Sequence, residues 1–153
     1  PGRAGLAGAL GLVHRLPDQA HGDCDLVFHA SGNPAGLVRA LELAGQDATV
    51  VEMSWYGRRS ADLPLGAAFH ARRLRLQSSQ VGRLPPPRSP RWDYRRRMEL
   101  ALALLVDPRL DALISGETDF TGLPALMQRL ADAPPGALCE RVRYADPATD
   151  HPC

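Results

Sequence analysis

The period of the hydrophobic positions changes several times along the chain, and each change marks a predicted element. Apolar residues run together at positions 26–29, which suits a buried strand and is too short for a helix. Over residues 34–44 the apolar positions recur at helical spacing, with Pro34 suited to the first turn and Gly45 to the stop. A second buried strand follows at 49–53. Strand, turn, helix and strand make a βαβ unit, which builds parallel sheets.

The rest of the chain keeps the alternation of helices and strands. The pattern predicts helices at 3–10, 93–106 and 123–131, and strands at 12–14, 74–79, 110–115 and 138–144. Proline-rich segments at 83–90 and 134–136 are typical of loops. The sequence therefore predicts an α/β fold.

The turns that follow the first two predicted strands are the expected ligand site. In parallel sheets, ligands bind beyond the carboxyl ends of the strands. The first turn contains Ala30, Ser31 and Gly32, and the second begins with Ser54 and Trp55. We therefore expect a ligand to contact both turns.

Composition excludes several classes of function. The 153 residues carry a net charge of +1, and no apolar run approaches the roughly 18 residues of a membrane span. The 18 basic residues are all arginine, so no lysine can form a Schiff base. An odd number of cysteines, Cys24, Cys139 and Cys153, and no secretion signal favour a cytoplasmic protein without a disulfide framework.

Three groups of residues suggest chemistry but fit structural roles better. His21, Cys24 and His29 resemble metal ligands, yet they lack a fourth partner, so no metal site is predicted. Asp23, Asp25 and Glu52 are expected to cap turns or pair with arginine. The serines lack a Gly-x-Ser-x-Gly elbow and a recognisable histidine relay, so a serine hydrolase is disfavoured.

An arginine-rich segment with interleaved aromatic residues precedes and enters the helix predicted at 93–106. Its members are Arg88, Arg91, Trp92, Tyr94, Arg95, Arg96 and Arg97. Single-stranded nucleic acid prefers such surfaces, but the low net charge favours a solvated face or a subunit contact. No nucleic-acid partner is predicted, and an arginine-rich nucleic-acid contact protein remains a rival interpretation.

The order of elements over residues 4–144 resembles the C-terminal half of the zinc-type medium-chain alcohol dehydrogenases. Residues 25–32, Asp-Leu-Val-Phe-His-Ala-Ser-Gly, resemble the fourth strand of that family's nucleotide domain and the turn after it. Residues 48–54, Ala-Thr-Val-Val-Glu-Met-Ser, and 74–79, Leu-Arg-Leu-Gln-Ser-Ser, resemble its next two strands. The resemblance implies an incomplete Rossmann-type domain at 1–109, with a parallel sheet and flanking helices. It also implies a segment at 110–145 that returns to a mostly absent GroES-like catalytic domain, and a tail at 146–153.

The resemblance also implies the residues that line the nicotinamide side of an NAD or NADP cleft. These are Ala30, Ser31, Gly32, Met53, Ser54, Trp55, Ser78 and Ser79. Departures from the family pattern include His29, which replaces a common acidic residue, and Gln46, Ser54 and Ser78, which replace glycines. The family's zinc ligands and phosphate-binding glycines belong to its upstream part, so no catalytic residue and no metal ligand is predicted here.

The implied function is part of an NAD(P)-dependent oxidoreductase that transfers hydride between nicotinamide and a small alcohol or carbonyl substrate. Zinc would belong to the full-length family, and the chain alone is expected to be inactive. The main rival is a non-catalytic half-Rossmann binding module that forms a homodimer through an exposed sheet edge.

Overall fold

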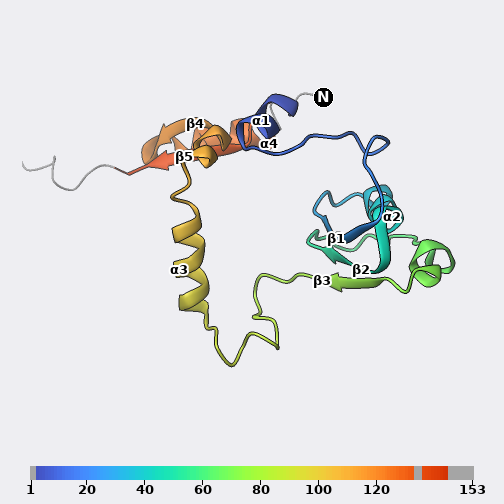
Figure 1. The fold of residues 1–153 in the computed structure, drawn as a ribbon. Coiled ribbons are helices and arrows are strands. Elements are labelled where there is room, and N and C mark those ends of the chain that lie inside the picture. The colour runs from blue at the N-terminus through green and yellow to red at the C-terminus, as the bar shows by residue number, and fades with distance from the viewer. Residues whose placement is uncertain (1–2, 133–135, 145–153) are drawn as a thin grey trace, which may run out of the picture. The chain divides into compact units, whose positions relative to one another are not determined.

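The computed structural model describes residues 3–132 and 136–144. Residues 15–94 form one compact unit, and the described parts of residues 1–14 and 95–153 form a second (Figure 1). Each unit contains its own parallel sheet. The predicted tail at 146–153 lies outside the described residues, and the assignment of residues 110–145 to a catalytic domain stays a prediction.

The first unit is built on a three-stranded parallel sheet. Its elements are β1 (Cys24–His29), α2 (Pro34–Leu43), β2 (Ala44–Glu52), η1 (Leu65–Phe69) and β3 (Arg75–Ser78). The strand order is β1-β2-β3, with both pairs parallel. The predicted βαβ unit and the α/β fold class are therefore confirmed.

Helix α2 begins as the sequence predicts and ends differently. Asn33 has an extended backbone, and its side chain accepts a hydrogen bond of 3.0 Å from the Ala35 N–H, while Pro34 occupies the first turn. The helix ends at Leu43 because Ala44 is already extended, so the predicted stop at Gly45 is wrong. Strand β2 follows directly at Ala44 and ends at Glu52. It therefore starts earlier and is longer than the strand predicted at 49–53.

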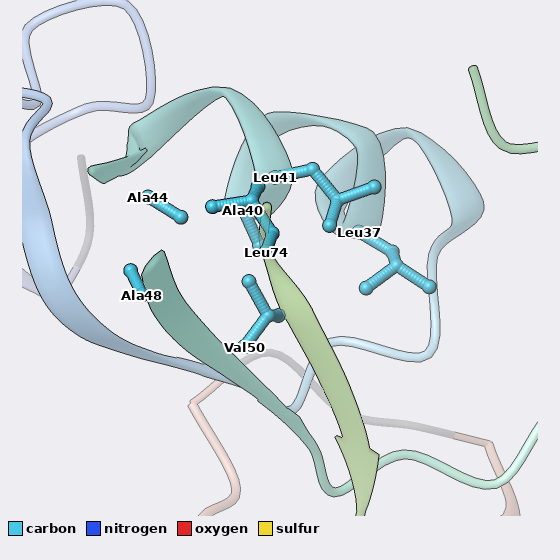
Figure 2. Close-up of a cluster of buried hydrophobic side chains, with 7 residues drawn as sticks. All are labelled: Leu37, Ala40, Leu41, Ala44, Ala48, Val50 and Leu74. Carbon is cyan, nitrogen blue, oxygen red and sulfur yellow. The ribbon is translucent and has the colours of Figure 1, made fainter. Parts of the chain in front are cut away.

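The core of this unit lies between α2 and one face of the sheet. Figure 2 shows the α2 side chains gathered against the strands. The buried cluster consists of Leu37, Ala40, Leu41, Ala44, Ala48, Val50 and Leu74. The helical members are three or four residues apart, and Ala48 and Val50 alternate along β2, so both periods direct apolar groups inward. This packing fixes α2 against one face of the sheet.

The opposite face of the sheet is exposed. Successive strand residues point to opposite faces, so Val27 and His29 face the core while Leu26 and Phe28 point away. Phe28 keeps 62% of its surface exposed. An exposed apolar sheet face of this kind is uncommon and is typical of contact surfaces.

The second unit holds helices and a two-stranded sheet. Its elements are α1 (Ala4–Ala9), α3 (Tyr94–Leu104), η2 (Pro108–Leu113), β4 (Ile114–Asp119), η3 (Phe120–Gly122), α4 (Leu123–Ala131) and β5 (Cys139–Arg143). Strands β4 and β5 pair in parallel, and the rings of Phe120 and Tyr144 stack with centroids 5.0 Å apart. The predicted helices and the final strand are confirmed within a few residues.

Two predicted strands of this unit are wrong. Residues 12–14 have no regular structure. Most of 110–115 belongs to the 3₁₀ helix η2, because the Asp107 carboxylate accepts a 3.0 Å hydrogen bond from the Arg109 N–H and Pro108 occupies the first turn. Strand β4 begins only at Ile114.

Candidate functional site

The carboxyl ends of β1, β2 and β3 lie side by side at one edge of the sheet. In the strand register, His29 is the partner of Glu52, and Glu52 is the partner of Ser78. The pairing continues past the strands, because the Met53 N–H donates to His29 O and the Ser79 N–H donates to Glu52 O, each at 2.8 Å. The turns after the strands therefore start at the same level of the sheet.

All residues predicted to line a cofactor cleft belong to this edge. Ala30, Ser31 and Gly32 follow β1, Met53, Ser54 and Trp55 follow β2, and Ser78 and Ser79 end or follow β3. Their role in binding a cofactor stays a prediction, but the fold brings together the three segments that carry them. Parallel order is the cause, since strands that run in one direction end at one edge.

The turn at Gly32 is open on one side. Gly32 adopts a φ of +64°, which a glycine reaches without strain, and a Cβ built there would meet nothing within 4 Å. Its N–H donates to Ser54 Oγ at 2.9 Å, which joins the turn after β1 to the turn after β2. Trp55 stands beside them with 89% of its surface exposed. The backbone here is accessible to a flat ligand.

A buried polar pair lies beneath the two turns. His29 Nδ1 and Glu52 Oε2 are 2.7 Å apart, and His29 Nε2 lies 2.7 Å from Ser31 Oγ. The exposed fractions of the His29 and Glu52 side chains are 6% and 12%. With the Glu52 carboxylate as acceptor, Nδ1 carries a proton, and Nε2 lies within hydrogen-bond distance of the Ser31 hydroxyl. One imidazole thus connects both strand ends.

The Glu52 carboxylate organises the turn that follows it. Oε1 accepts a 2.6 Å hydrogen bond from the Ser54 N–H, and Oε2 accepts one of 3.0 Å from the Tyr56 hydroxyl. Burial raises the pKa of Glu52, but the hydrogen bonds from Ser54, His29 and Tyr56 outweigh it and hold the pKa below its ordinary value. Burial and the bond to Glu52 raise the pKa of Tyr56. The negative charge of Glu52 is therefore stabilised by hydrogen bonds from the protein itself.

Sequence reasoning missed this pair. Glu52 was expected to cap a turn or bind an arginine. It does cap the turn that follows it, through the Ser54 N–H, but its contacts with His29 and Tyr56 were not expected. A signal was present, because His29 and Glu52 are both the last polar residues of buried strands that a βαβ unit places next to each other. Their hydrogen bond depends on a register that the pattern alone does not fix.

Ser31, His29 and Glu52 have the order of a catalytic triad but not its surroundings. Ser31 Oγ also accepts from the Asn33 N–H at 3.2 Å, and a Cβ added to Gly36 would lie 2.7 Å from it. The hydroxyl therefore faces the first turn of α2. The N–H that follows the serine, at Gly32, is already bonded to Ser54. An acyl group would not find that oxyanion donor free, which argues against a serine hydrolase.

The described residues do not form a metal centre. Cys24 Sγ contacts His21 O at 3.6 Å, and both ring nitrogens of His29 are engaged by Glu52 and Ser31. Within residues 3–132 and 136–144, no group of three or more metal-ligating side chains converges. The described part of the chain therefore does not fit a zinc ion.

The arginine-rich segment lies away from this edge in sequence and has a local partner. Arg95 forms an ion pair of 2.9 Å with Glu99, one turn further along α3. The Tyr94 hydroxyl donates to Gly82 O at 2.8 Å. Such a pair is typical of a solvated helix face.

The second unit contains a polar hollow of about 390 Å³. Ser115 Oγ and Glu140 Oε1 are 2.9 Å apart at its wall, and Arg129 reaches Glu140 at 3.5 Å. None of the predicted cofactor residues lines it. The carboxyl edge of the first sheet therefore stays the candidate site.

Solved dehydrogenases share this fold. An alcohol dehydrogenase from Thermus sp. ATN1 matches with a TM-score of 0.69 and 22% identity, over 95% of this chain and 42% of its own. A 2R,3R-butanediol dehydrogenase from Bacillus subtilis matches with a TM-score of 0.67 and 14% identity, over 94% of this chain and 41% of its own. A short chain alcohol dehydrogenase from Escherichia coli CFT073, complexed with the cofactor NADH, matches at 0.52 and 20%, over 75% and 30%.

These matches define the class of fold. The chain has the fold of part of a dehydrogenase with a Rossmann-type sheet, and it spans less than half the length of these relatives. The resemblance to alcohol dehydrogenases is thereby confirmed at the level of the fold. No protein-family model and no curated protein sequence matches the chain.

Membrane insertion finds no support in the helices. Among the described residues, no helix is long and apolar enough to cross a bilayer.

Proposed function

We propose that the chain is the nicotinamide-facing part of an NAD(P)-dependent, zinc-type alcohol dehydrogenase-like oxidoreductase. The observation that carries the proposal is the meeting of the turns after β1, β2 and β3 at one carboxyl edge. Ligands of open parallel sheets bind there. The fold shared with dehydrogenases, one of them solved with NADH, supports the same assignment.

The residues present suit the nicotinamide end of a dinucleotide. Short side chains at Ala30, Ser31 and Ser54 let the backbone approach a ligand, and the space beside Gly32 is open. The exposed indole of Trp55 offers a flat face on which a nicotinamide ring can stack. A bound nicotinamide supplies hydride exchange with a small alcohol or carbonyl substrate. The contribution of this chain is to bind and orient that ring.

Catalysis requires more than these residues. Because the described residues hold no zinc-binding group, the 153-residue chain alone should not turn over alcohols with NAD or NADP. Zinc-dependent turnover by the isolated chain would contradict this. We also propose a cytoplasmic location, since Cys24 and Cys139 are free thiols.

The two tryptophans offer a direct test of binding. When the indole is excited, Trp55 should transfer energy to NADH bound at the carboxyl edge. The resulting NADH emission should saturate as the NADH concentration rises. Trp55→Phe should abolish most of this transfer, whereas Trp92→Phe serves as the matched control and should preserve it. Saturable transfer that survives Trp55→Phe and disappears in Trp92→Phe would place the nucleotide elsewhere.

A second candidate is a non-catalytic module that dimerises. The exposed face with Leu26 and Phe28, and the unpaired edges of β1 and β3, favour it. Light scattering after size exclusion separates the candidates: a dimer that shows no energy transfer to NADH supports the module, and nucleotide binding supports the dehydrogenase.

A further inference from the structure

We propose that His29 and Glu52 form a positioning pair, which holds the turns after β1 and β2 at the spacing that a bound nicotinamide dinucleotide needs. The inference rests on the proposed function and names the residues that regulate the geometry of its site. Neither side chain is assigned a contact with the ligand, because His29 is buried and Glu52 is only 12% exposed and engaged by the turn residues. They act through Ser31 and Ser54.

The pair closes a ring of hydrogen bonds across the two turns. From Gly32 the ring passes through Ser54 Oγ at 2.9 Å, and from the Ser54 N–H to Glu52 Oε1 at 2.6 Å. It continues from Glu52 Oε2 to His29 Nδ1 and from Nε2 to Ser31 Oγ, each at 2.7 Å. The chain itself joins Ser31 to Gly32. Each turn is therefore held by the other.

The linked and partly buried hydrogen bonds make this ring act as a unit. In a low-dielectric site, linked hydrogen bonds strengthen one another, and removal of one member weakens its neighbours. The strands have separate supports, namely the ladder hydrogen bonds and the apolar cluster around Leu41 and Val50. Loss of the pair should therefore loosen the turns while the sheet remains.

Gly36 shows how closely the pair is fitted to the helix above it. A Cβ at this position would lie 2.8 Å from His29 Nε2, so α2 approaches the imidazole through a residue without a side chain. On the side of β2, the Tyr56 hydroxyl donates a hydrogen bond of 3.0 Å to Glu52 Oε2, in the turn that follows the strand. The imidazole and the carboxylate thus have little freedom to reorient.

The test compares NADH affinity in Glu52→Gln and His29→Gln with that in Glu42→Gln. Glu42 is the matched control, because it lies in the same unit and forms an exposed ion pair of 3.0 Å with Arg39. Measured by energy transfer or by NMR titration, NADH binding should weaken at least about fivefold in the first two variants, the lower end of typical coupling between sites. Glu42→Gln should bind as the wild type does.

Two readouts separate positioning from a general loss of stability. Without nucleotide, the Gly32 amide resonance should shift in Glu52→Gln, although Glu52 does not bond to Gly32 directly. The double variant should bind NADH no more weakly than the weaker-binding single variant, since both substitutions break one ring. If Glu52→Gln does not fold, Tyr56→Phe removes one donor to the same carboxylate and takes its place.

The outcomes are distinct. If the wild type binds NADH and the folded variants bind it with the same affinity, the positioning role is overturned and the proposed function still stands. Absence of NADH binding by the wild type overturns the proposed function and the positioning role together. If NADH binding weakens but the Gly32 resonance does not shift, the positioning role is overturned, because the two turns would then not be coupled.

Discussion

Gly36 lies in the first turn of α2, where the helix passes over His29 and Ser31. Glycine inside a helix costs up to about 1 kcal/mol relative to alanine, so an alanine at such a position is normally stabilising. Here the added Cβ would fall 2.7 Å from Ser31 Oγ and 2.8 Å from His29 Nε2. The absence of a side chain is what lets helix and polar pair coexist.

We therefore expect Gly36→Ala to destabilise the first unit by about 1–3 kcal/mol, the range of overpacked interiors. Gly66→Ala is the control, because nothing lies within 4 Å of a Cβ at Gly66, and its effect should stay within about 0.5 kcal/mol. Urea unfolding followed by tryptophan fluorescence measures both. A stabilised Gly36→Ala would contradict the fitted contact.

Glu52 makes stability depend on acid. Its folded pKa lies below the unfolded value of about 4.5, so the unfolded state binds more protons between the two values. The stabilisation is therefore present above pH 4.5 and is lost as the pH falls through the folded pKa. Wild-type unfolding free energy should fall more steeply below about pH 4.5 than that of Glu52→Gln. Parallel curves would show that the carboxylate gains nothing from its partners.

At the scale of elements, periodicity predicted the βαβ unit well, because the apolar residues that repeat at helical or strand spacing are the ones that form the core. Leu37 and Leu41 repeat at helical spacing, and Ala48 and Val50 alternate, and all four are buried. The pattern failed where local hydrogen bonds decide. Asp107 and Pro108 start a 3₁₀ helix, whereas the apolar residues at 110–115 predict a strand.

The site divides in the same way. The turns that carry Ser31 and Ser54 could be predicted, because they follow recognisable strands. The bond between His29 and Glu52 could not, because it needs the register of β1 against β2 and the approach of α2 at Gly36. A residue's neighbours across a sheet depend on tertiary contacts that a single sequence does not display.

The α2 contact with the sheet carries the stability of the first unit. Leu41 is 2% exposed, and Leu41→Ala should cost about 2–5 kcal/mol through lost burial and a residual cavity. Leu65→Ala in η1 of the same unit, where the side chain is 49% exposed, should change stability by less than about 0.5 kcal/mol. Trp55 and Trp92 both belong to residues 15–94, so their fluorescence reports this unit. Equal effects of the two substitutions would contradict the assigned core.

At the scale of the whole molecule, the chain presents two units, each with a short parallel sheet. The first unit carries every residue assigned to the nicotinamide side, and its outer face exposes Leu26 and Phe28. The whole chain spans less than half the length of the dehydrogenases whose fold it shares. The proposed role of this chain is therefore to bind and orient the nucleotide rather than to carry out the complete reaction.

The most direct measurement is an amide NMR titration of the ¹⁵N-labelled chain with reduced nicotinamide mononucleotide, and separately with adenosine monophosphate. The account predicts saturable shifts that concentrate at the three turns, strongest near Ser31, Gly32 and Ser54, and larger with the nicotinamide nucleotide. Shifts confined to residues 95–132 and 136–144, or no saturable shift at the turns, would contradict the claim that this carboxyl edge receives the nicotinamide.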